Sequence, residues 1–151
     1  MKEIKEEGIE EFIDAWLCGI YEELMFWNEY IEKKGGKFSA NWDRNTNPDR
    51  PFTLEKDIPV HQYGKTLDFI DIGSGPFSRC GTSTDKVILN HTAIDPLADA
   101  YKIMKQKAGL KSNINLQTGF VEILDKFLSK NSYDIVHMSN SLDHCFDPIM
   151  V

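Results

Sequence analysis

The feature that most constrains the fold is a short apolar run ending in a glycine turn. Residues 67–72 read LDFIDI, and Gly73-Ser-Gly-Pro follows directly. A run of about four to eight mostly apolar residues bounded by turn residues is typical of a strand buried in a parallel sheet. Glycines directly after such a strand let the backbone pass close to a ligand, because no Cβ intervenes. The sequence therefore predicts a buried strand leading into a ligand-binding turn.

Beyond this turn, strand patterns alternate with helix patterns. Further strands are expected at residues 91–95 (with 87–89 leading in), 113–117 and 133–139, and helices at residues 96–108 and 120–128. Alternation at this spacing predicts an α/β fold with a Rossmann-like, doubly wound, mostly parallel sheet. Right-handed crossovers give this sheet the strand order 3-2-1-4.

The N-terminal part has a different pattern of apolar residues. Apolar residues recur at three- and four-residue spacing from residue 9 to about residue 34, which predicts one amphipathic helix, or two short helices broken near Gly19. Gly35 and Gly36 predict its end. Residues 39–59 lack a period and predict an irregular connector that wraps over the surface. We therefore expect a helical extension with a connector over residues 1–64 and the front part of a ligand-binding domain over residues 65–151.

Composition excludes several classes of partner. The 151-residue chain carries a net charge of −7 with scattered basic residues, which argues against nucleic acid. No stretch approaches the roughly 18 apolar residues that a membrane span needs, and the N-terminus lacks an apolar signal core. Three cysteines without metal-type spacing predict free thiols in the cytoplasm.

A cofactor site is expected at the carboxyl ends of the strands. Asp95 lies 22 residues beyond Gly73, at the end of the second predicted strand. A carboxylate there can accept both hydroxyls of a nucleoside ribose, which indicates an adenosine-containing cofactor near the switch point between strands 1 and 4. The predicted cofactor-binding residues at these two strand ends are Gly73, Ser74, Gly75, Asp95 and Pro96.

The class of cofactor depends on charge. A dinucleotide fingerprint would place a third glycine where Ser78 stands. Asp71 would repel a pyrophosphate but attract the amino group of a methionine moiety, which favours S-adenosylmethionine (SAM) over NAD. The alternative for Asp71 is that it braces the loop.

The loop after the fourth strand carries the predicted catalytic groups. His144 is suited to taking a proton from an acceptor, with Asp143 orienting it or contacting substrate. The alternative is that His144 supports the loop or packs beside the cofactor. A metal site formed by His137, Asp143, His144 and Asp147 matches no ligand spacing typical of zinc, so no metal is expected. Phe120 is expected either against the adenine ring or in the core.

Three motifs stand out: Asp71-Ile-Gly-Ser-Gly-Pro76, Ala93-Ile-Asp95-Pro96-Leu97, and Tyr133-Asp-Ile-Val-His137 followed by Asn140-Ser-Leu-Asp-His144. Together they resemble class I SAM-dependent methyltransferases, and the similarity is closest to the bacterial branch called methyltransferase domain type 11. The resemblance implies that Asp71, Gly73 and Gly75 line the methionine end of SAM. It also assigns Asp95 to the ribose, Phe120 to the adenine edge and Asn140 to the floor of the site. Trp16, Tyr21 and Trp27 would form part of a lid, or pack as an ordinary helix stripe.

The sequence departs from that family in two places. Phe77 replaces a third glycine, and residues 78–83 begin a helix poorly, so the usual first helix is expected to be short or absent. Arg79 then becomes the candidate partner of the SAM carboxylate. Such domains continue through three more strands, so strand 4 is expected to form an apolar edge through which copies of the chain associate.

These features lead to one main functional hypothesis and two rivals. The main hypothesis is SAM-dependent methyl transfer to a hydroxyl or amine of a small molecule or glycan. The first rival is a non-catalytic SAM-binding module that acts through a partner. The second is a nucleotide-binding oxidoreductase half-domain, which Asp71 disfavours.

Overall fold

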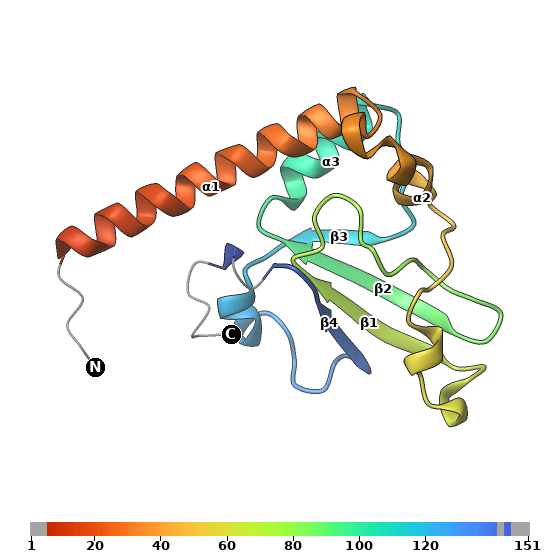
Figure 1. Cartoon of the computed structure of the whole chain (residues 1–151). Coiled ribbons are helices and arrows are strands. Elements are labelled where there is room, and N and C mark those ends of the chain that lie inside the picture. Colours follow the sequence, from red (N-terminus) through yellow and green to blue (C-terminus); the bar gives the residue numbers. More distant parts are fainter. Residues whose placement is uncertain (1–5, 142–143, 146–151) are drawn as a thin grey trace.

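The computed structural model describes residues 6–141, 144 and 145 of the chain (Figure 1). Its centre is a four-stranded sheet formed by β1 (Thr66–Ile72), β2 (Ile88–Asp95), β3 (Asn115–Thr118) and β4 (Ile135–Met138). All strands are parallel and their order is β3-β2-β1-β4, so the predicted α/β, Rossmann-like sheet with order 3-2-1-4 is confirmed.

The register aligns the carboxyl ends of the strands. Ile72 of β1 lies opposite Ile94 of β2 and Met138 of β4, and Asp95 lies opposite Thr118 of β3. Every loop that follows a strand therefore leaves from the same edge of the sheet, and this edge lies beneath the long N-terminal helix (Figure 1). In open parallel sheets ligands bind at this edge.

The N-terminal helix α1 (Glu6–Glu32) is continuous and runs through Gly19 without a break. A single glycine costs a helix only about 1 kcal/mol, which packing of the remaining turns can offset. The helix ends where predicted: Gly35 has a φ of +90°, and its N–H donates to the carbonyl of Tyr30 at 2.7 Å. Only the C-terminal half of α1 lies over α3 (Ala98–Lys107), and its N-terminal half extends beyond it (Figure 1).

The connector between α1 and β1 consists of short turns of helix. They are η1 (Gly36–Asn41), α2 (Trp42–Thr46), η2 (Glu55–Asp57) and η3 (Val60–Gln62). This segment is irregular, and it also supplies part of the core, which the sequence did not predict. Phe52 (3% exposed) and Ile58 pack in one buried cluster with Leu67 and Phe69 of β1.

The link between β1 and β2 forms turns and bends without a helix over residues 73–87, as expected for this chain. The segment after β3 contains η4 (Val121–Lys126), a 3₁₀ helix rather than the predicted longer helix. The connector, α3 and the end of α1 all pack against one face of the sheet. There Ala93 and Leu116 pack with Tyr101 of α3, whose side chain is fully buried.

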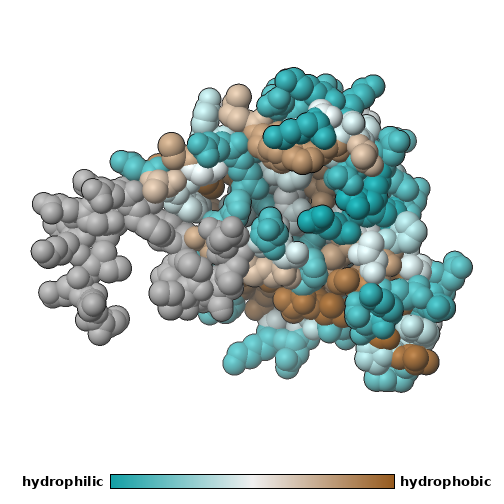
Figure 2. Space-filling model, in the orientation of Figure 1, coloured by the Kyte–Doolittle hydropathy of each residue, from teal (hydrophilic) through white to brown (hydrophobic). Residues whose placement is uncertain are grey.

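β4 forms one edge of the sheet, and Val136 on it is 65% exposed. Figure 2 shows apolar atoms gathered on the part of the surface where β1 and β4 lie. Among the described residues, no helix combines the length and the apolar character that crossing a membrane requires.

Candidate functional site

A cavity of about 390 Å³ opens between α1 and the carboxyl ends of the strands. Its size is within the range of roughly 300–1,000 Å³ that small-molecule and cofactor sites occupy. Five segments contribute to its wall: α1 (Ala15, Trp16, Gly19, Ile20, Glu23), the end of β1 (Ile72, Gly73), the end of β2 (Ile94, Asp95, Pro96, Leu97), the loop after β3 (Gly119, Phe120, Val121, Glu122) and the end of β4 with its loop (Met138, Asn140, Ser141, His144, Cys145).

The structure brings six of the predicted site residues to this one cavity. They are Gly73, Asp95, Pro96, Phe120, Asn140 and His144. Asp143, the remaining predicted catalytic residue, lies outside the described residues, as does Asp147 of the metal alternative.

Gly73 is a glycine for a steric reason. Its φ is +65°, in the left-handed region that other residues rarely adopt, and its N–H donates to the carbonyl of Ile94 at 2.8 Å. A Cβ at this position would overlap the Cβ and Oγ of Ser141, which belongs to the loop after β4. The absence of a side chain therefore lets the turn after β1 and the loop after β4 meet directly at the floor of the cavity.

Asp95 is 5% exposed and is held by two backbone groups. Oδ2 accepts from the N–H of Gly75 and Oδ1 accepts from the N–H of Leu97, both at 2.9 Å. Burial raises the pKa of Asp95 to about 6, although these two hydrogen bonds lower it in part. A carboxylate oxygen has further lone pairs, so Asp95 can also accept a hydroxyl from a ligand in the cavity.

An aromatic pair lies between α1 and the loop after β3. The rings of Trp16 and Phe120 have centroids 6.4 Å apart and are tilted by 42°. Of the three predicted lid residues, only Trp16 lines the cavity. Tyr21 is 63% exposed, and Trp27 packs in the core, 3.3 Å from the place where a Cβ of Gly75 would be.

His144 lies close to α1, where Glu23 is within ion-pair distance of its ring. The Nδ1 atom lies 3.4 Å from Oε2 of Glu23, and the side chain of His144 is 55% exposed. Glu23 is in turn fixed by Trp27 and Tyr101, whose Nε1–H and O–H donate to Oε1 at 3.3 and 3.2 Å. The structure thus supplies a carboxylate for His144 that sequence adjacency did not reveal. The one pattern in the sequence that relates to this carboxylate is the four-residue spacing of Glu23 and Trp27, which places both on one side of α1.

Asp71, Ser74 and Gly75 are predicted site residues that are not among the described residues lining this cavity. Successive residues of a strand point to opposite faces, and Ile72 lines the cavity, so Asp71 is directed to the other face. There its Oδ1 lies 2.7 Å from Nδ1 of His137. The prediction that Asp71 lines the methionine end is therefore not supported, and the bracing role fits its contacts. Arg79 is exposed and does not line the cavity either.

Asp71, Cys80 and His137 form a compact cluster on that other face. One ligand atom from each lies within 4.8 Å of the others, so the cluster could hold a metal ion. Burial raises the pKa of the Cys80 thiol to about 12, so without a bound cation the thiol is protonated. The same atom of His137, Nδ1, faces both Asp71 (2.7 Å) and Cys80 (3.4 Å). A Cys-His-Asp relay needs both ring nitrogens, so this arrangement is not one.

Charge distinguishes this cavity from a pyrophosphate site. Its described lining includes the carboxylates of Glu23, Asp95 and Glu122 but no lysine or arginine. Such a lining favours a cationic ligand and disfavours a dinucleotide.

The chain was compared with protein-family models, curated proteins and solved structures, and none of them matches it.

Proposed function

We propose that the chain binds SAM in the 390 Å³ cavity and transfers its methyl group to a hydroxyl or amine of a small molecule or glycan. The observation that carries the proposal is the acidic lining of a cavity at the carboxyl ends of a parallel sheet. SAM carries a sulfonium and an ammonium group, whereas NAD carries a pyrophosphate, so three carboxylates and no lysine or arginine among the described lining residues favour the former.

The geometry also supports a particular orientation. Asp95, at the end of β2, would accept the ribose hydroxyls, and Phe120, at the end of β3, would lie near the adenine. Gly73 and Asn140 would border the methionine moiety, since they follow the two strands at the switch point. Gly19 removes a side chain from the face of α1 that lines the cavity, which leaves room for the ligand there.

SAM supplies an electrophilic methyl group, and the protein must align the acceptor with it. The acceptor oxygen or nitrogen forms the new bond to the methyl carbon while the bond from carbon to sulfur breaks, and the acceptor proton leaves. His144 would take this proton, and Glu23 would stabilise the imidazolium that results. The principal contribution of the protein would be alignment, which can lower a barrier by several kcal/mol (roughly 7–11 in the best cases).

The test is calorimetric titration with S-adenosylhomocysteine, with NAD as the comparison ligand. We expect saturable binding of S-adenosylhomocysteine only, and loss of this binding in Asp95→Ala. The matched control is Asp99→Ala, which removes an exposed carboxylate four residues away that pairs with Lys102. An unchanged dissociation constant in a folded Asp95→Ala variant, or tighter binding of NAD, would refute the assignment.

A non-catalytic SAM-binding module is the second candidate, because more than half of the His144 side chain is exposed, unlike a base enclosed in a dry site. The two candidates differ in the effect of His144→Ala. A catalytic role requires that methyl transfer falls while binding of S-adenosylhomocysteine persists. A binding module would show the same binding and no transfer with either protein.

A further inference from the structure

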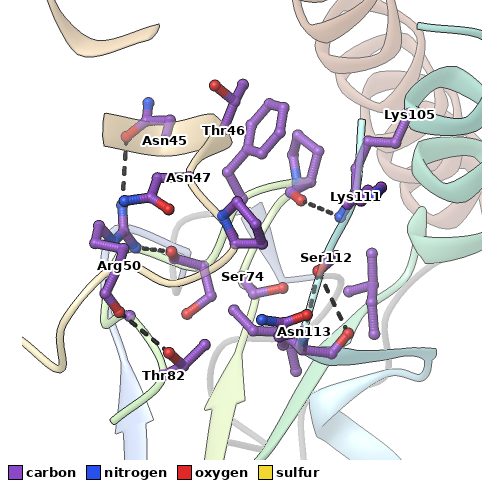
Figure 3. Close-up of a pocket in the computed structure, with 18 of the residues that line it drawn as sticks. Asn45, Thr46, Asn47, Arg50, Ser74, Thr82, Lys105, Lys111, Ser112 and Asn113 are labelled. Carbon is purple, nitrogen blue, oxygen red and sulfur yellow. Dashed lines mark hydrogen bonds between the residues drawn. The ribbon is translucent and has the colours of Figure 1, made fainter. Parts of the chain in front are cut away.

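A second, smaller pocket lies beside the glycine turn, between the connector, the turn after β1 and the segment after α3 (Figure 3). Its volume is about 30 Å³, two to three times the ~10–15 Å³ that one water molecule needs. The pocket can therefore hold a small ion or group but not a nucleotide. Ser74 and Gly75, which the SAM cavity leaves out, contribute to its wall.

Arg50 is one of two buried cations in this pocket. Its side chain is 6% exposed; Nη2 donates to the carbonyl of Ser78, and Nη1 lies 3.5 Å from Oδ1 of Asn45. The Nε–H group is buried and has no hydrogen-bond partner. Burial lowers the pKa of Arg50, and the neighbouring charges of Arg44 and Arg79 lower it further. Arg50 is therefore a buried cation with one donor unsatisfied.

Lys105 is the second cation, and Figure 3 shows it on the side of the pocket opposite Arg50. It is 8% exposed, and its Nζ donates to the carbonyl of Pro76 at 2.9 Å and lies 5.6 Å from the centre of the Phe77 ring. An ammonium group has three donors, so the one carbonyl leaves capacity for another acceptor. Burial lowers the pKa of Lys105.

No acidic residue is among the described residues that line the pocket, and neither cation forms an ion pair with any described carboxylate. The carboxylate of Asp71 acts on Arg50 electrostatically, but it is already paired with His137. A buried charge without a counter-charge is costly, and two in one pocket of a chain with net charge −7 require an explanation. Among the other lining residues, Lys111 adds an exposed ammonium group, whereas the hydroxyls of Ser74 and Ser112 already donate to the carbonyls of Gly75 and Ile114.

We propose that this pocket binds a phosphate group between Arg50 and Lys105. A tetrahedral oxyanion carries enough acceptor oxygens for the unsatisfied Nε–H of Arg50, the ammonium of Lys105 and the ammonium of Lys111. The group is either inorganic phosphate or the terminal phosphate of a small phosphomonoester, since both present the same oxyanion. The proposal does not depend on SAM binding, because the two cations do not line the SAM cavity.

The test is calorimetric titration of the full chain with inorganic phosphate and, separately, with glycerol 3-phosphate, in chloride buffer of matched ionic strength. We expect saturable binding, weakened about tenfold to a hundredfold in Lys105→Met, which removes one charge-assisted hydrogen bond. Lys102→Met is the matched control, because Lys102 is on the same helix but is exposed and paired with Asp99. It should bind phosphate like the unaltered chain.

A second variant keeps the proposal testable if Lys105→Met does not fold. Lys111 is exposed and lines the pocket, so Lys111→Met should keep the fold and weaken phosphate binding to a smaller extent. Tighter binding of glycerol 3-phosphate would identify a phosphomonoester as the ligand, and tighter binding of inorganic phosphate would identify the free ion. The proposal is overturned if millimolar phosphate shows no saturable binding, or if folded Lys105→Met and Lys102→Met bind it equally.

Discussion

The contact between Gly73 and Ser141 gives the sharpest test of how the cavity floor is built. In Gly73→Ala, the new methyl group would lie closer than 3.0 Å to Cβ and Oγ of Ser141. Serine Cβ is attached to the backbone and cannot rotate away, so the loop after β4 must move. Two costs then add: roughly 1–2 kcal/mol for a left-handed residue with a Cβ, and roughly 1–3 kcal/mol for the overlap.

A control variant separates these costs. Gly64 has a φ of +78°, similar to that of Gly73, but a Cβ there would meet nothing within 4 Å. Gly64→Ala should therefore lose only the conformational part, roughly 1–2 kcal/mol of unfolding free energy. Gly73→Ala should lose roughly 2–5 kcal/mol. Urea unfolding of both variants measures the difference.

A double-mutant cycle then attributes the difference to Ser141. Ser141→Gly alone loses the hydrogen bond from its Oγ to the carbonyl of Ile72. In Gly73→Ala/Ser141→Gly the overlap is gone, so the pair should show a favourable coupling of about 1–3 kcal/mol. The reasoning is refuted if Gly73→Ala and Gly64→Ala destabilise equally, or if the two changes at positions 73 and 141 are merely additive.

Three further predictions follow from the described contacts. Burial raises the pKa of Asp95 from 3.8 to about 6, so the folded chain binds its proton more tightly than the unfolded chain. The unfolding free energy should therefore fall by roughly 3 kcal/mol as the pH rises from about 4 to about 6, because Asp95 loses its proton. Urea unfolding at several pH values should show this decrease, and Asp95→Asn should remove it. Gly81→Ala places a Cβ against the backbone of residues 50–51, whereas Gly109 has a similar φ and open space around it. In urea unfolding, Gly81→Ala should therefore lose at least about 2 kcal/mol more unfolding free energy than Gly109→Ala. Equal losses would contradict the packing around Gly81. Cys18 is exposed, whereas Cys80 is 1% exposed with a pKa raised to about 12 by burial, so a thiol reagent followed by mass spectrometry should label Cys18 in the native chain and Cys80 only after unfolding.

Local sequence determined the strands and their order. The apolar run before Gly73 and the run before Asp95 both form strands, because a continuous apolar segment gains most when both of its faces are covered. Right-handed crossovers then leave few strand orders open, and the observed β3-β2-β1-β4 is the predicted one. Gly35 ends α1 because few residues other than glycine adopt its φ at low cost.

Local sequence was less informative where two structures of similar free energy compete. Gly19 suggested a break in the first helix, but α1 continues through it. The segment after β3 had the period of a helix, but only the short 3₁₀ helix η4 forms. The balance in both places depends on the surface against which the segment packs, which a local pattern does not contain.

Tertiary structure alone decided which side chains share a site. The motifs predicted that Asp71 and Asp95 would both line the cofactor site. In the structure the pleat of β1 directs Asp71 to His137 on the other face of the sheet, and of the two residues only Asp95 lines the cavity. Glu23 meets His144 from a helix more than a hundred residues away, and Arg50 and Lys105 come to one pocket from separate elements. The sequence determined the strands and the turn that bears the site, because these depend on neighbours along the chain. The charge of the site depends on which distant side chains the packing brings together, so only the folded structure decided it.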